Sequence, residues 1–111
     1  MNRDALYVLP PGFPDRGERQ FCPECAEVWG YLAYYPAIRE TLEVIYQPLE
    51  HPRPGLVARL GDGQWNCPTL VLAEGSPEGQ GMKVRGGVRY IDNARDMARY
   101  WSSRFGTALP R

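Results

Sequence analysis

The sequence lacks the features that mark nucleic-acid-binding and membrane proteins. Its 13 basic and 13 acidic residues cancel, so the formal net charge is zero, and lysine occurs once, as Lys83. Affinity for a phosphate backbone needs concentrated positive charge, which the scattered arginines do not provide. No apolar run approaches the roughly 18 residues that span a bilayer. We therefore expect neither nucleic acid nor a membrane as a partner.

The start of the chain has too few apolar residues for an export signal. Only five apolar or aromatic residues, 5–9, follow the first four, whereas a signal peptide needs an apolar region of about 7–15 residues. We therefore expect a cytoplasmic protein, in a compartment that keeps thiols reduced. Cysteine is also scarce, with three residues. The odd number argues against a disulfide scaffold and favours a catalytic or metal-binding role for a Cys-x-x-Cys pair.

The length and the apolar patterns predict one α/β domain over residues 1–111. Short runs rich in β-branched and aromatic residues predict strands at 5–9, 42–46, 69–73 and 83–91. Periodic apolar residues predict helices at 23–35 and 94–105, with a short one at 56–60. Gly86-Gly87 inside the fourth strand indicates a bulge or a close backbone approach. Residues 13–20 are expected to form a loop that turns at 15–17, and the Gly-Ser-Pro-Glu-Gly signals within residues 74–81 predict an exposed hairpin loop.

The stretch Cys22-Pro23-Glu24-Cys25 opens the first long helix. Proline fits the first helical turn because its missing N–H has no partner there in any case. Cys22 would then lie at the helix N-terminus, where unpaired N–H groups and the helix dipole stabilise a thiolate. Cys25, one turn further on the apolar face, would be shielded. We assign Cys22 as the nucleophile and Cys25 as the resolving thiol. The alternative is that both are ordinary apolar residues.

Charges near this pair act in opposite directions. Glu24 lies between the two cysteines, and its carboxylate would oppose a thiolate through like-charge repulsion. Arg16 or Arg19 would favour the thiolate if the 13–20 loop folded over the site. The sequence therefore predicts a reactive Cys22 but leaves its redox potential open.

The order β-α-β-α-β-β-α, with Cys22-Pro23-Glu24-Cys25 at the first helix and Cys67-Pro68 before the third strand, resembles the thioredoxin-fold superfamily. Proline after the first cysteine is similar to glutaredoxins, as is Gly86-Gly87 followed by a capped helix at Asp92-Asn93. The similarity is strongest to small bacterial thioredoxin-like proteins of uncharacterised function. It covers nearly the whole chain and implies a four-stranded mixed sheet with helices on both faces.

The resemblance also implies further site residues. The Cys67–Pro68 peptide bond would be cis, and the backbone of Cys67 would pair with an extended substrate. From the residues alone, a trans proline at a strand start is the alternative. Asp92 and Asn93 would hold the γ-glutamyl group of glutathione, although capping of the last helix explains them equally well.

Three roles remain open for Cys67. It is a small buried apolar residue, a third redox partner, or a metal ligand together with Cys22 and Cys25. In the last case zinc or an iron–sulfur cluster would need a fourth ligand from His51, glutathione or a partner chain. The gap of 41 residues between Cys25 and Cys67 is unlike a compact zinc motif. We interpret His51 as a surface histidine.

The sequence thus predicts a glutaredoxin-like thiol–disulfide oxidoreductase that acts on protein or glutathione disulfides. It would be a monomer with no tightly bound cofactor, and glutathione would be a co-substrate at most. One alternative is a thioredoxin-fold binding module that ligates zinc or an iron–sulfur cluster. Another is an adaptor that has the fold but no turnover.

Overall fold

The computed structural model describes residues 2–111, and its main sheet has five strands. These run in the spatial order β4-β1-β5-β7-β6. Their bounds are Asp4–Val8 for β1, Leu42–Tyr46 for β4, Thr69–Val71 for β5, Lys83–Arg85 for β6 and Val88–Ile91 for β7. β1 pairs in parallel with β4 and antiparallel with β5, and β7 pairs antiparallel with both β5 and β6. The sheet is therefore mixed.

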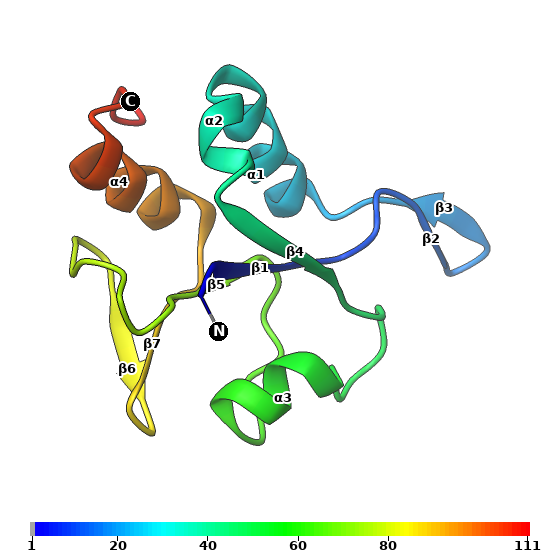
Figure 1. The fold of residues 1–111 in the computed structure, drawn as a ribbon. Coiled ribbons are helices and arrows are strands. Elements are labelled where there is room, and N and C mark those ends of the chain that lie inside the picture. The colour runs from blue at the N-terminus through cyan, green and yellow to red at the C-terminus, as the bar shows by residue number, and fades with distance from the viewer. Residues whose placement is uncertain (1) are drawn as a thin grey trace.

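Helices cover both faces of this sheet (Figure 1). On one face, α1 (Pro23–Tyr34) and α4 (Ala94–Phe105) pack over Leu6 and Val8 of β1. On the other face, α3 (Pro54–Leu60) packs over Ala5 and Tyr7. Successive residues of a strand point to opposite faces, so the wholly apolar run that follows Asp4 in β1 supplies both cores. Among residues 2–111, no helix is long and apolar enough to cross a membrane.

The two long helices lie within one residue of their expected bounds because their end signals are local. In contrast, α3 begins two residues earlier than expected, and the short helix α2 (Pro36–Arg39) was not expected. α1 begins at Pro23, and α2 follows it directly after Tyr35. α4 begins after Asn93, whose side chain accepts a hydrogen bond from the Asp96 N–H at 2.9 Å. It ends at Gly106, whose φ of +76° is easily adopted by glycine.

The expectation of four strands was wrong by one strand. Gly86 and Gly87 have φ of +57° and +78°, so they form the tight turn of a β6–β7 hairpin rather than a bulge in one strand. Two consecutive residues at positive φ are typical of a type I′ turn, whose twist matches that of the flanking strands. Glycine allows both a bulge and a tight turn. Which of the two forms depends on the strand that pairs with this segment.

Residues 13–20 form a β-hairpin rather than the expected loop. β2 (Phe13–Asp15) and β3 (Glu18–Gln20) make a separate two-stranded sheet that projects from one side of the molecule (Figure 1). The turn is formed by Arg16 and Gly17, both at positive φ. We refer to this hairpin as the arm.

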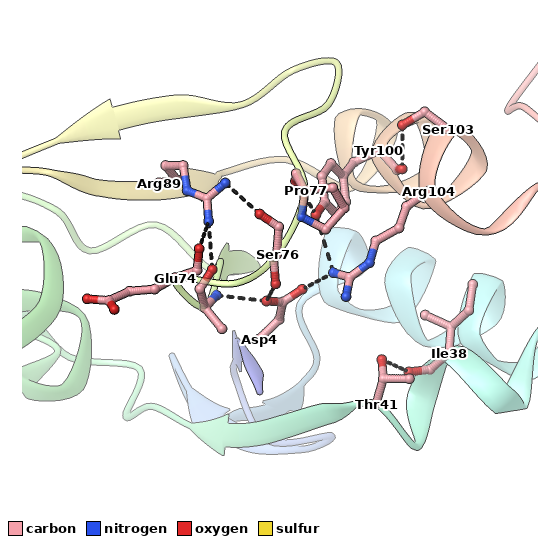
Figure 2. A network of polar contacts seen from close by, with 11 residues as sticks. Asp4, Ile38, Thr41, Glu74, Ser76, Pro77, Arg89, Tyr100, Ser103 and Arg104 are labelled. Atoms are coloured by element: carbon pink, nitrogen blue, oxygen red, sulfur yellow. Dashed lines mark hydrogen bonds and ion pairs between the residues drawn. The ribbon is translucent and has the colours of Figure 1, made fainter. Parts of the chain in front are cut away.

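The loop that follows β5 is fixed by buried polar groups (Figure 2). Asp4 accepts hydrogen bonds from the Ala73 N–H at 2.8 Å and from the Ser76 hydroxyl, and it pairs with Arg104 at 2.8 Å. Arg89 donates to the carbonyl groups of residues 73, 74 and 76. The sequence predicts an exposed hairpin loop over residues 74–81, but Ser76 is buried. The expected exposure was wrong for Ser76, because the groups that bury it, such as Asp4, come from distant segments of the chain.

Candidate functional site

Cys22 lies at the N-terminus of α1, as its place before Pro23 predicts. It is the N-cap residue, and its Sγ accepts a hydrogen bond from the Cys25 N–H at 3.2 Å. The Cys22 Sγ also lies 3.9 Å from the carbonyl oxygen of Cys67, to which its thiol can donate. The backbone donor is one of the helix N–H groups that have no helical partner.

Cys25 is buried one turn further into α1, with 3 % of its surface exposed. Burial raises the pKa of this thiol well above its usual range, because a charged sulfur in an apolar environment loses its solvation. Its interaction with Cys22 raises the pKa further, and a backbone hydrogen bond at Leu9 acts in the opposite direction. The two cysteines therefore differ in access, since Cys22 is partly exposed and Cys25 is buried.

Cys67 and Pro68 lie directly before β5, next to Cys22. The Cys67–Pro68 peptide bond is cis, as the resemblance implied. Burial raises the pKa of the Cys67 thiol to about 11, although the positive charge of Arg53 lowers it. The backbone carbonyl of Cys67 thus faces Cys22, while its own thiol stays protonated at neutral pH.

Arg53 is a buried cation next to this loop. It is 8 % exposed, and its guanidinium donates to the carbonyl oxygens of Pro48 at 2.9 Å, Leu49 at 2.9 Å and Trp65 at 2.5 Å. The ring of Trp65 also packs against the exposed His51, with the ring centroids 4.5 Å apart. These contacts fix the segment that leads into Cys67. His51 therefore lies at the surface, as expected.

Asp92 and Asn93 lie at the start of α4 and are already engaged within the protein. Asp92 forms an ion pair with Lys83 at 3.0 Å, and Asn93 caps the helix. Asn66 connects this turn to the Cys67–Pro68 loop, because its amide donates to the carbonyl oxygens of Pro68 and Asp92. The structure therefore brings the two predicted substrate-binding segments together through Asn66.

Glu24 lies between the two cysteines, but its carboxylate is directed to the start of α4. It accepts a hydrogen bond from the Ala94 N–H at 2.9 Å. The positive end of a helix dipole stabilises an anion at this position, so this contact holds the Glu24 side chain against the start of α4. The exposed arginines Arg16 and Arg19 lie on the arm, and neither lines the groove beside Cys22.

An apolar groove of about 470 Å³ borders Cys22. Its walls come from the end of β1 and the following prolines, the start of α1, and the end of β4. They contain no charged side chain: Leu9, Pro10, Pro11, Phe21, Cys22, Cys25, Ala26, Trp29 and Tyr46. Cys67 is not among them. The Cys67–Pro68 loop, which also lies next to Cys22, is therefore not part of the groove wall.

The hypothesis of a metal centre finds no support in the positions of the donor atoms. All three cysteines are free thiols. Across residues 2–111, no three histidine, cysteine or acidic side chains are grouped in a way that could hold a metal ion. A tetrahedral zinc site needs four ligands at about 2.0–2.3 Å, so the thiols would have to rearrange.

The sequence interpretation missed four contributors to this site: Arg53, Asn66, and the groove residues Phe21 and Tyr46. Asn66 carries a weak local signal, since asparagine before a turn often bonds nearby backbone groups. The other three carry none, because their roles depend on contacts between segments far apart in the chain.

Comparison with known proteins identifies a family. The model of a family described as "Protein of unknown function (DUF3088)" matches residues 3–109, which is nearly the whole chain. No curated protein and no solved structure matches.

Proposed function

The chain belongs to the DUF3088 family, whose description names no activity, and we propose from the site itself that it is a thiol–disulfide oxidoreductase. We propose further that its fold is thioredoxin-like and related to that of glutaredoxins. Three features support this assignment: the parallel β1–β4 pair, the antiparallel β5 and β7 beside it, and a Cys-x-x-Cys pair at the start of α1.

The observation that carries the proposal is the contrast between Cys22 and Cys25. The first sulfur lies at a helix N-terminus, accepts a backbone hydrogen bond at 3.2 Å, and borders an open groove. The second lies one turn away and is buried. A disulfide exchange enzyme needs one accessible nucleophilic thiol and one resolving thiol nearby, and this pair provides both.

The first step is the attack of the Cys22 thiolate on one sulfur of a substrate disulfide. The substrate S–S bond breaks, a mixed disulfide forms with Cys22, and one substrate thiolate leaves and takes up a proton. Cys25 then loses its proton and attacks the Cys22 sulfur. This forms the Cys22–Cys25 disulfide and releases the second substrate thiol. The two enzyme thiols are oxidised by two electrons in total, and the substrate disulfide is reduced by two.

The raised pKa of Cys25 has a consequence for the second step. A thiol that stays protonated at neutral pH attacks slowly, since the thiolate is the nucleophile. Loss of the Cys25 proton is then the event that commits the enzyme to product release.

The test is a single turnover of the fully reduced protein with a disulfide-bonded peptide, followed by mass measurement after an acid quench. We expect the wild type to lose two hydrogens and release two peptide thiols. Cys25→Ser should stop at a mixed disulfide whose added mass is that of the peptide, and Cys22→Ser should form no adduct. Reduction of the peptide by Cys22→Ser at the wild-type rate would overturn the proposal. An adaptor without turnover would leave all three proteins unmodified.

A further inference from the structure

The apolar groove beside Cys22 has the size and position of a substrate subsite. Its volume of about 470 Å³ lies within the range of about 300–1,000 Å³ that is usual for ligand pockets. Because Cys22 is part of its wall, a group held in the groove lies next to the sulfur that would attack a disulfide.

Two large aromatic side chains are exposed at this groove. Phe21 is 59 % exposed and Tyr46 is 53 % exposed, and they come from the segment before α1 and from the end of β4. A single exposed aromatic residue on a protein surface is ordinary. Here, however, two of them line one hollow together with the partly buried Trp29. Burial of aromatic surface by a partner is a major source of binding energy.

We infer that the groove binds an apolar side chain adjacent to a cysteine of a disulfide-bonded polypeptide, and that polypeptide disulfides are the preferred substrates. This inference rests on the oxidoreductase function proposed above and specifies its substrate class. With the apolar side chain in the groove, the substrate disulfide lies over Cys22. Residues of an extended chain are about 3.3 Å apart, so a position one or two residues from the cysteine can reach the groove.

The surroundings of Cys22 are unfavourable for glutathione disulfide, the alternative substrate. Each glutathione carries two carboxylates and an ammonium group, and buried charges of this kind need paired charges or hydrogen-bond donors. No charged side chain lines the groove. At the start of α4, the N–H groups of Ala94 and Asp96 already bond Glu24 and Asn93, and Lys83 is paired with Asp92.

The experiment compares two peptides, each closed by one internal disulfide, that differ only in the residue beside one cysteine: phenylalanine or aspartate. Oxidised glutathione is the third substrate. Single-turnover rates with the reduced protein are divided by the rates at which dithiothreitol reduces the same compounds, which removes intrinsic differences in reactivity. We expect a ratio of at least about tenfold in favour of the phenylalanine peptide, the scale of discrimination by an apolar pocket.

Alanine variants locate the source of this ratio. Phe21→Ala and Tyr46→Ala should move the phenylalanine-to-aspartate ratio towards one. Tyr34→Ala is the matched control, because Tyr34 is 82 % exposed and lies outside the groove, and it should leave the ratio unchanged. All three side chains are exposed, and a thermal melting curve for each variant is the check that it is folded.

Three results would overturn the inference: a wild-type ratio of one, a faster reaction with oxidised glutathione than with the phenylalanine peptide, or an equal effect of Tyr34→Ala. A dimer in sedimentation that Phe21→Ala dissociates would show that a second copy of the chain fills the groove instead. Failure of the wild type to reduce any of the three compounds would instead overturn the oxidoreductase function, and this inference with it.

Discussion

The carboxylate of Glu24 accepts a hydrogen bond from the Ala94 N–H at 2.9 Å, across 70 residues of sequence. The residue between the two cysteines of α1 is thus bound to the first turn of α4. This contact fixes the orientation of the segment that carries Cys22.

Glu24→Ala should destabilise the protein by about 1 kcal/mol, because a side chain that satisfies a helix N–H contributes about 0.5–2 kcal/mol. Glu24→Gln keeps an oxygen acceptor and should cost less. The control is Glu27→Ala, which removes an exposed ion pair with Arg95, a type of contact that contributes about 0–1 kcal/mol. Urea unfolding of the reduced protein measures all three. A larger loss for Glu27→Ala than for Glu24→Ala would show that the contact between α1 and α4 does not have this role.

Cys67 should react slowly with iodoacetamide at neutral pH, because burial raises its thiol pKa to about 11 and only the thiolate reacts. At pH 8 its thiolate population is roughly a hundredfold below that of a thiol with a pKa of 9.0. The rate should keep rising with pH beyond 9 and level off only near 11. In urea-unfolded protein it should level off near the ordinary thiol value.

Tryptic mass mapping separates the thiols in this measurement. Cys67 lies on the fragment 60–83, whereas Cys22 and Cys25 share the fragment 20–39. The pH at which the Cys67 rate levels off distinguishes protonation from poor access, since poor access lowers the rate at every pH. A plateau near 9 in the folded protein would contradict the prediction.

Asp4→Ala should be among the most destabilising single substitutions in this chain. It leaves Arg104 without its carboxylate and the Ala73 N–H without its acceptor, in a region where the Asp4 side chain is almost fully buried (Figure 2). Removal of one partner of a buried ion pair costs about 3–5 kcal/mol. Ser76→Ala removes one hydrogen bond from the same carboxylate and should cost about 1 kcal/mol. Chemical unfolding should rank the two variants in this order, and the reverse order would contradict the role of Asp4.

The same glycine-to-alanine change should have opposite effects at two positions. Gly17 has a φ of +78° and open space around it. Alanine there should destabilise the arm by about 1–2 kcal/mol, only because its backbone is strained at positive φ. Gly30 lies within α1, also with open space around it, where alanine should stabilise by about 0.5–1 kcal/mol. Urea unfolding measures the Gly30 variant, and hydrogen exchange of the amides in the arm measures the Gly17 variant. If both substitutions changed stability in the same direction, the turn assigned to Arg16 and Gly17 would be contradicted.

Much of the fold could be predicted from the sequence, because its signals are local. Pro23, the apolar spacing of α1 and the cap at Asn93 each fix an element boundary from neighbouring residues. The three-residue strands of the arm are too short and too charged to show an alternating pattern. Gly86-Gly87 was misinterpreted because a bulge and a tight turn use glycine for the same reason. The difference between them depends on the strand partners.

The candidate site, like the fold, could be predicted from the sequence only in part. Cys22 and Cys25 were found from their spacing, and Cys67 and Pro68 from a resemblance. The groove was not found, since Pro10, Phe21 and Tyr46 meet only after β1 and β4 have paired. The partners of Asp4 lie 69, 72 and 100 residues away. No local pattern encodes contacts of this kind.

The pairing of Phe13 with Gln20 brings the two ends of the arm together. Paired residues of antiparallel strands have Cα atoms about 4.5–5.5 Å apart, so the path from β1 to α1 is the same whether the arm is long, short or exchanged for another hairpin. The arm is therefore a natural insertion point: a tag or a recognition loop placed between Asp15 and Glu18 should leave the geometry of Cys22 intact.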